Sequence, residues 1–173
     1  YDIIDDPESL KSAILSQDRL AQIECVLIQH RKRKGTPSIC LHGETINRCI
    51  VTEGGLKFEV QPGVNQNAGL FLDMAPLRTW LQENSENRNI LNLFAYTCSL
   101  SVAALAGGAT QAVNVDMSKP SISWGIRNHE LNGQDPRSVK SIPHNMFRSW
   151  GRIKQFGRYD TIIIDPPSRQ RGS

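Results

Sequence analysis

Residues 90–99 are Ile90-Leu91-Asn92-Leu93-Phe94-Ala95-Tyr96-Thr97-Cys98-Ser99, an apolar run followed by a short polar stretch. Such a run is typical of a buried strand, and the small residues that follow as far as Ala106 are typical of a helix, which Gly107-Gly108 would end. The same alternation continues along the chain. It predicts strands at 90–94, 112–116, 139–142 and 159–165, with helices at 76–83, 100–106, 118–132 and 146–156. We therefore expect an α/β fold with a mostly parallel sheet and helices on both faces.

The residues before this core predict a smaller accessory unit. Asp6-Pro7-Glu8 is a typical helix start. After a break near 16–18, the apolar residues Leu20, Ile23, Leu27 and Ile28 recur at helical spacing. Short β-like runs follow between 38 and 60, and Gly54-Gly55 predicts a hairpin turn. We expect an N-terminal unit of a helix and a β-hairpin over 1–63, and an incomplete α/β core over 64–173.

Composition excludes some classes of protein. The chain has 173 residues, of which 39 % are hydrophobic and 21 % charged, so it can bury a core. Its apolar runs are far shorter than the roughly 20 residues of a membrane span, and no secretory signal is visible, so we expect a cytoplasmic protein without a membrane partner. The four cysteines include no CxxC pair, so we expect no metal site.

Positive charge concentrates near the C-terminus. Residues 136–173 carry eight basic and two acidic side chains, whereas residues 1–135 carry 12 basic and 15 acidic ones. Such a cluster either faces phosphates or is simply a solvated surface. Arg31-Lys32-Arg33-Lys34 is a second basic run with the same two interpretations.

Polar signals follow each predicted strand, where ligands bind in sheets of this kind. These signals are Phe94-Ala95-Tyr96-Thr97, then Asp116, His144-Asn145 and Asp165-Pro166-Pro167. Asp116 follows Phe94 by about 22 residues, the place of an acid that binds ribose hydroxyls, although a simple turn aspartate is the alternative. The first loop lacks the glycines that a pyrophosphate needs. We therefore expect an adenosyl ligand without phosphates, such as S-adenosylmethionine.

Asp165-Pro166-Pro167 is the second signal. Two prolines fix the backbone and remove two donors, so the carbonyls of Asp165 and Pro166 are free to accept hydrogen bonds. A carboxylate and a carbonyl can hold an N–H group of a planar base. The alternative interpretation is an ordinary turn that ends a strand.

Several motifs together resemble the class I methyltransferases that use S-adenosylmethionine to make 5-methylcytosine or 7-methylguanine in large-subunit ribosomal RNA. The resemblance covers about residues 50–173 and includes Asn67–Asp73, Leu91–Thr97, Val115–Ser118, Asn128–Gly133 and Asp165–Ser168. It implies a Rossmann-like core, S-adenosylmethionine as cofactor and RNA as partner. A complete domain of this class has more strands than the four expected here.

The resemblance also implies roles for individual residues. Asp116 would bind the ribose, Met117 would lie against the adenine, and Asn145 occupies the place of an aspartate near the adenine amino group. The expected cofactor-binding residues are Phe71, Asp73, Phe94, Tyr96, Thr97, Ser99, Asp116, Met117, Asn132, Asn145 and Met146. The residues expected to face the methyl group and the target base are Asp165, Pro166 and Pro167.

Some positions depart from the pattern of the family. Asn92 replaces a common aspartate, and Arg169 stands where relatives often have Phe. No cysteine adjoins Asp165, which mildly favours methylation of a nitrogen. Two other functions remain open: a methyltransferase acting on a protein or small molecule, and a non-catalytic RNA-binding module. A homodimer is also left open.

Overall fold

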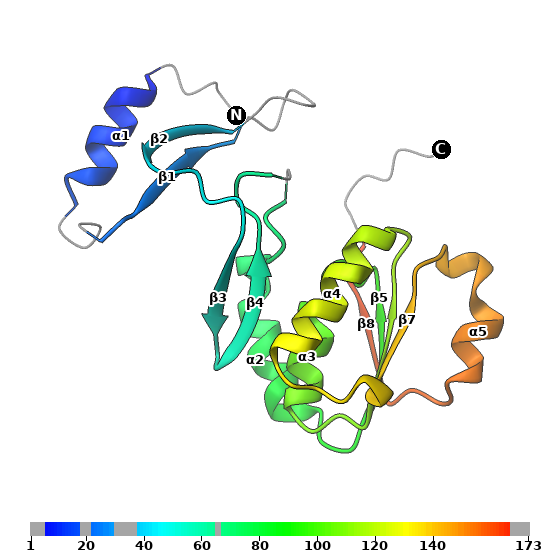
Figure 1. The fold of residues 1–173 in the computed structure, drawn as a ribbon. Helices are drawn as coiled ribbons and strands as arrows, with labels where there is room; N and C mark the ends of the chain where they lie inside the picture. The colour runs from blue at the N-terminus through cyan, green and yellow to red at the C-terminus, as the bar shows by residue number, and fades with distance from the viewer. Residues whose placement is uncertain (1–5, 18–21, 30–37, 65–66, 167–173) are drawn as a thin grey trace. The chain divides into compact units, whose positions relative to one another are not determined.

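The computed structural model describes residues 6–17, 22–29, 38–64 and 67–166 (Figure 1). The chain divides into two compact units. The N-terminal unit comprises residues 1–49 and 60–68, and the sheet unit comprises 50–59 and 69–173. This division differs from the predicted boundary at residue 63, because residues 50–59 of the hairpin group with the sheet.

The described residues of the N-terminal unit form one helix and a two-stranded sheet. Helix α1 (Pro7–Leu15) begins as predicted, with Asp6 Oδ1 accepting hydrogen bonds from the backbone N–H groups of Glu8 and Ser9. Strands β1 (Cys25–Ile28) and β2 (Ile39–Gly43) pair antiparallel.

The prediction that the helical pattern continues through residues 23–28 is wrong. Cys25–Ile28 forms strand β1, and Leu20 lies outside the described residues. An apolar run this short does not by itself distinguish a helix from a strand. Pairing with the distant strand β2 satisfies the backbone of β1 and decides the outcome.

Strands β3 (Cys49–Glu53) and β4 (Leu56–Val60) form the predicted hairpin. Both turn residues have positive φ, 56° at Gly54 and 78° at Gly55, which is the conformation that a two-residue hairpin turn requires. The prediction of a turn at Gly54-Gly55 is therefore confirmed.

The main sheet contains β5 (Asn89–Leu93), β6 (Gln111–Val115), β7 (Val139–Ile142) and β8 (Thr161–Ile164) in the order β7-β6-β5-β8. All neighbouring pairs are parallel, which confirms the predicted sheet. The first strand, β5, lies between the second and the fourth. The strand order therefore reverses beside β5, and ligands bind at such a reversal.

Helices cover both faces of this sheet, as predicted (Figure 1). Side chains such as Ile90 and Ala112 pack with α2 (Ala75–Asn84) and α3 (Ser99–Ala106), beside α4 (Lys119–Leu131). Their neighbours Leu91 and Val113 face the other way and pack with Ile153 of α5 (Trp150–Gln155). Successive strand residues point to opposite faces, so two apolar layers form from one sheet.

The predicted helix at 146–156 is divided into two pieces. A 3₁₀ turn, η4 (Met146–Arg148), precedes α5, and Ser149 separates them. Ser149 is buried, and its hydroxyl donates to the carbonyl of Asn145 and contacts His144 Nδ1. A side chain that bonds to nearby backbone competes with a continuous helix. The described part of the chain also contains the 3₁₀ turns η2 (Leu72–Met74) and η3 (Pro136–Ser138).

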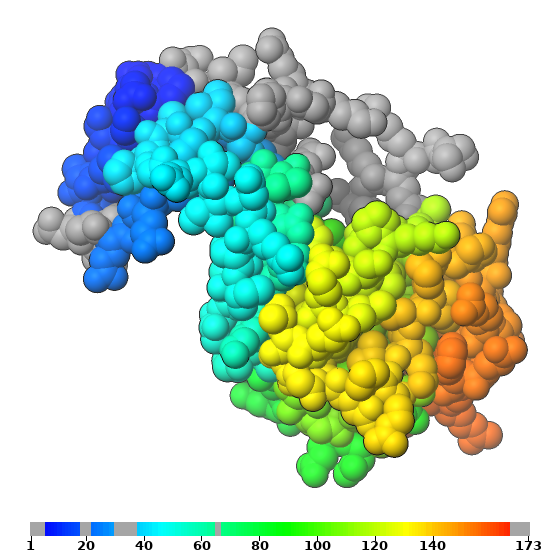
Figure 2. All heavy atoms as spheres, in the orientation of Figure 1, coloured from blue at the N-terminus to red at the C-terminus, as the bar shows by residue number. Residues whose placement is uncertain are grey.

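Helix α5 and the turn before it lie at the surface of the sheet unit, where Figure 2 shows them in orange. Within the part of the chain that the structure describes, no helix has the length and apolar character needed to cross a membrane. The same residues contain no group of three or more His, Cys, Asp or Glu side chains suited to a metal ion.

Candidate cofactor-binding site

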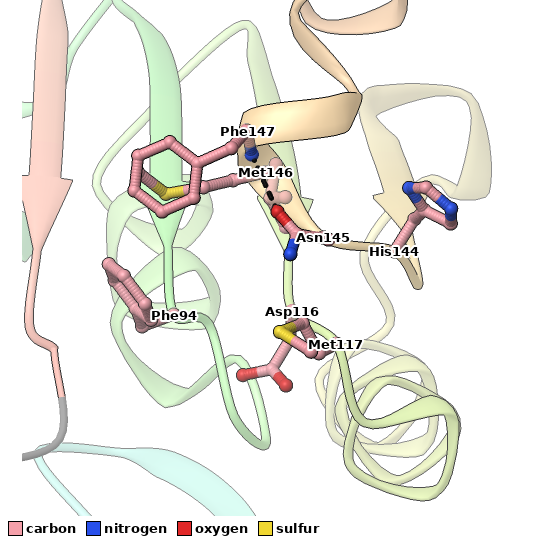
Figure 3. Close-up of a pocket in the computed structure, with 8 residues that line it drawn as sticks. Phe94, Asp116, Met117, His144, Asn145, Met146 and Phe147 are labelled. Carbon is pink, nitrogen blue, oxygen red and sulfur yellow. Dashed lines mark hydrogen bonds between the residues drawn. The ribbon is translucent and has the colours of Figure 1, made fainter. Parts of the chain in front are cut away.

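A pocket lies at the carboxyl ends of β5, β6 and β7 (Figure 3). It is an open pocket with about 350 Å³ of space free of protein atoms, a volume that includes open solvent. The lining residues come from three strand ends: Phe94, Val115, Asp116, Met117, His144, Asn145, Met146 and Phe147. The structure thus brings together five of the residues predicted from the sequence: Phe94, Asp116, Met117, Asn145 and Met146.

Asp116 directly follows β6 and is held in one orientation by backbone donors. Its Oδ2 accepts a hydrogen bond from the N–H of Tyr96 (2.9 Å), and its Oδ1 accepts one from the N–H of Ser118 (2.8 Å). A carboxylate offers about four acceptor positions. Two positions therefore remain for hydroxyl groups of a ligand.

The loop of residues 94–98 has an unusual backbone. Phe94, Tyr96 and Cys98 have φ values of 56°, 46° and 61°, in the left-handed region that residues other than glycine seldom adopt. Each such conformation costs roughly 1–3 kcal/mol and persists only when its surroundings impose it. Here the N–H of Ala95 bonds to Val115 and the N–H of Cys98 bonds to Ala95. The loop then leads into Ser99, the first residue of α3.

Aromatic rings pack beside this loop. The ring centroids of Phe71 and Tyr96 lie 5.3 Å apart, and those of Tyr96 and Trp124 lie 6.3 Å apart. Burial raises the pKa of the Tyr96 phenol, and the charge of Asp116 acts in the same direction. Tyr96 therefore keeps its hydroxyl proton at neutral pH. The ring of Phe71 thus lies beside the loop, whereas Asp73 lies exposed in η2.

Two predicted ligand contacts have other partners. The hydroxyl of Thr97 is buried and donates to the carbonyl of Gly69 (2.6 Å). The amide of Asn132 bonds to both the N–H and the carbonyl of Lys57 in β4. Because their polar groups are bonded within the protein and neither residue lines the pocket, we leave both side chains out of the candidate site. The other predicted residues outside the pocket lining are Phe71, Asp73, Tyr96 and Ser99.

Asn145 and its neighbours close the pocket from the β7 side. Asn145 Oδ1 accepts a hydrogen bond from the N–H of Phe147 (2.8 Å), which shapes the turn η4. Phe147 is 69 % exposed and lines the pocket, although it is not among the residues predicted from the sequence. The sequence places Phe147 two residues after Asn145, and this closeness to a predicted site residue could have indicated that Phe147 lines the pocket.

Asp165 and Pro166 follow β8 at the same edge of the sheet. Ile164 of β8 pairs with Leu93 of β5, so Asp165 leaves its strand beside the residue that begins loop 94–98. Among the described residues, the Asp165 side chain has no hydrogen-bond partner. Pro167 and Arg169 lie outside the described residues.

The chain matches a family model over residues 11–173, and that model describes S-adenosylmethionine-dependent methyltransferases. It is 37 % identical over 146 residues to the ribosomal RNA large subunit methyltransferase K/L of Hahella chejuensis, covering 82 % of this chain and 19 % of that protein. It is 35 % identical to the ribosomal RNA large subunit methyltransferase K of Neisseria meningitidis, covering 84 % of this chain and 42 % of that protein. The chain thus spans less than half the length of these relatives.

Solved structures show the same fold. The SAM-dependent methyltransferase from Agrobacterium tumefaciens is 26 % identical with a TM-score of 0.74, over 90 % of this chain and 51 % of that one. SMU.776 in complex with SAH is 31 % identical with a TM-score of 0.72, over 78 % of this chain and 36 % of that one. With the family match over most of its length, this chain belongs to the S-adenosylmethionine-dependent methyltransferases.

Proposed function

We propose that this chain forms the cofactor-binding part of an enzyme that transfers a methyl group from S-adenosylmethionine to a base of ribosomal RNA. The observation that carries the proposal is the fixed carboxylate of Asp116 in a pocket next to loop 94–98. Backbone donors orient this carboxylate before any ligand binds. Pre-oriented groups bind a ligand without a further ordering cost.

The pocket has the chemistry that a nucleoside without phosphates requires. Asp116 has acceptor positions left for ribose hydroxyls, and Phe94, Met117, Met146 and Phe147 offer apolar surface for a planar base. The Nδ2 group of Asn145 can donate to a ring nitrogen. Loop 94–98 contains no glycine that would let its backbone approach a pyrophosphate. These residues fit S-adenosylmethionine better than a dinucleotide.

Asp165 and Pro166 are the proposed contacts to the target base. When bound, the cofactor supplies a methyl group that is already activated by its sulfonium, so the protein mainly needs to position the acceptor. The Asp165 carboxylate and the Pro166 carbonyl would accept hydrogen bonds from N–H groups of the base. Proline has no N–H group, so Pro166 itself adds no competing donor.

Two observations favour ribosomal RNA as the acceptor. Relatives that are 33–38 % identical to this chain over the aligned residues are named ribosomal RNA large subunit methyltransferases. In addition, residues 136–159 contain six basic and no acidic side chains. Arg148, Arg152, Lys154 and Arg158 are exposed there, and none has an ion pair among the described residues. A surface of this kind binds the phosphates of RNA. Ribosomal RNA as substrate would place the enzyme in the cytoplasm.

The decisive experiment measures binding and transfer in the full-length protein. Calorimetric titration with S-adenosylhomocysteine should show one saturable site. Transfer of a radioactive methyl group should occur on deproteinised ribosomal RNA and not on a protein mixture. Absence of cofactor binding would refute the enzymatic proposal, and transfer only to protein would refute the choice of RNA.

A further inference from the structure

Asn128 of α4 joins two segments that lie far apart in the sequence. Its side chain is fully buried. Oδ1 accepts a hydrogen bond from the N–H of Glu59 in β4 (2.9 Å), and Nδ2 donates one to the carbonyl of Thr97 (2.9 Å). Thr97 lies between Tyr96 and Cys98, both of which have a left-handed backbone. A single amide therefore ties the strained loop to the helix and to the hairpin.

The loop is held from two sides close to its centre. On the pocket side, the N–H of Tyr96 donates to Asp116. On the α4 side, the carbonyl of Thr97 accepts from Asn128. Only the backbone dihedrals of Tyr96 and Thr97 lie between these two hydrogen bonds. Loss of the Asn128 contact would let the Tyr96 N–H turn away from Asp116.

Helix α4 also contacts the loop directly, one turn before Asn128. A β-carbon on Gly125 would overlap the side chain of Cys98 and approach the backbone of Thr97 within 3.1 Å. The absence of a side chain at Gly125 lets the helix backbone reach the loop. Gly125 and Asn128 are three residues apart and therefore lie on the same face of the helix.

We propose that Asn128 is a positioning residue for the cofactor site, which holds loop 94–98 in the left-handed conformation that orients Asp116. This inference rests on the proposed function, because it takes the pocket beside Asp116 to be the cofactor site. Asn128 would not touch the cofactor. It would act through the carbonyl of Thr97.

The competing interpretation is that Asn128 only fastens the hairpin to α4. The chain contains a matched control for that role. Asn132, one helical turn later, bonds to the N–H (2.9 Å) and the carbonyl (2.8 Å) of Lys57 in the same strand, β4. Among the described residues, the side chain of Asn132 forms hydrogen bonds with Lys57 and Asn128 and none with loop 94–98, and Asn132 lies outside the pocket. Replacing Asn132 therefore weakens the hairpin contact and removes a hydrogen bond to the backbone carbonyl of Asn128 (2.7 Å), but both side-chain hydrogen bonds of Asn128 stay in place.

The test compares Asn128→Ala with Asn132→Ala in the full-length protein. The dissociation constant of S-adenosylhomocysteine is measured by calorimetry, at a temperature where circular dichroism shows both variants folded. We expect Asn128→Ala to weaken binding by about tenfold or more, as the loss of a buried hydrogen bond allows, and Asn132→Ala to change it less than about threefold. Equal changes in the two variants would overturn the inference.

A second variant and a second readout keep the test decisive. Asn128→Asp keeps an oxygen for the N–H of Glu59 but places another oxygen against the carbonyl of Thr97, and it should weaken binding like Asn128→Ala. Hydrogen exchange of the Tyr96 and Cys98 amides, measured without ligand, should be faster in both Asn128 variants and unchanged in Asn132→Ala. Unchanged exchange in the Asn128 variants would overturn the inference. If the parent protein binds no S-adenosylhomocysteine, the proposed function fails, and the exchange data still decide whether Asn128 holds the loop.

Discussion

The side chain of Cys98 occupies the space that a β-carbon on Gly125 would need. Cys98 is buried with a left-handed φ of 61°, and burial raises the pKa of its thiol far above the usual range, so it packs as a neutral group. The two residues come from loop 94–98 and from α4. Their complementary volumes allow helix and loop to meet without a gap.

This relationship predicts that Gly125→Ala destabilises the protein strongly and that Cys98→Gly removes most of that effect. The new methyl group in Gly125→Ala has no space while Cys98 is present. Glycine at position 98 vacates the space and also tolerates the left-handed backbone. Urea unfolding of the single and double variants should give a coupling free energy of at least about 1 kcal/mol. Additive effects would show that the two side chains do not share this space.

Asp116→Ala is expected to weaken the binding of S-adenosylhomocysteine by at least about tenfold, because charge-assisted hydrogen bonds contribute roughly 1.5–3 kcal/mol each. The change also removes the acceptor that orients the Tyr96 N–H. Glu83→Gln removes an acid that is exposed on α2 and should leave the affinity unchanged. Calorimetry on both variants provides the comparison. An unaltered dissociation constant in Asp116→Ala would exclude Asp116 from the site.

Asp165→Ala is expected to slow methyl transfer by about 100-fold or more, the effect typical of losing a positioning group. Cofactor affinity should change less than about fivefold, since Asp165 is proposed to contact the target base. Single-turnover transfer and a cofactor titration on the same variant separate the two effects. Near-normal transfer would mean that Asp165 only ends strand β8. A comparable loss of cofactor affinity would move Asp165 to the cofactor side.

RNA binding is expected to weaken with added salt, and reversing the charge of exposed residues on and after α5 should flatten this dependence. The variant carries Glu at Arg152, Lys154 and Arg158. A control of equal net charge carries Glu at three basic residues outside this segment, at Lys11, Lys57 and Arg88. Binding measured over a series of salt concentrations should show the smaller slope only in the first variant. The same slope in both would identify the α5 cluster as a solvated surface.

We expect the folded protein to lose stability in mild acid because of the buried side chain of His129. The ring is buried, its Nδ1 lies 2.6 Å from Gln134 Oε1, and its Nε2 lies near Ser101 and Asn114. Gln134 uses its Nε2 as a donor to Val102, so its Oε1 accepts the proton on His129 Nδ1. His129 is therefore a neutral ring with an accepting Nε2.

Burial lowers the pKa of His129 below 6.5, and the hydrogen bond to Gln134 only partly opposes this. Below the pKa that His129 has in the unfolded chain, the unfolded chain binds a proton at His129 and the folded protein does not. The free energy of unfolding therefore falls as the pH decreases below about 6.5. His129→Gln should remove this contribution. Urea unfolding between about pH 7.5 and 5.5 should show a steeper loss in the parent, by up to roughly 1.4 kcal/mol per pH unit. Parallel profiles would contradict the prediction.

The sequence alone determined the features that depend on neighbouring residues. Alternating apolar runs and helix signals predicted the four parallel strands and the two-faced sheet. The helix predicted over 118–132 is α4, and the hydroxyl of Ser118 caps its start by accepting from the N–H of Ser121. Gly54-Gly55 predicted the hairpin turn. Asp116 and Asp165 could be selected because a residue that ends a parallel strand lies at the ligand edge wherever the strands sit in the sheet.

Only the tertiary structure decided the features that depend on distant partners. Cys25–Ile28 became a strand because β2 supplies its hydrogen bonds. Thr97 and Asn132 carry polar groups that could bind a ligand, yet they bond to Gly69 and Lys57, 28 and 75 residues away. Asn128 became important because it bridges Glu59 and Thr97, 69 and 31 residues away. Periodicity and capping act over a few residues, whereas these roles require a partner that only the folded chain brings within hydrogen-bonding distance.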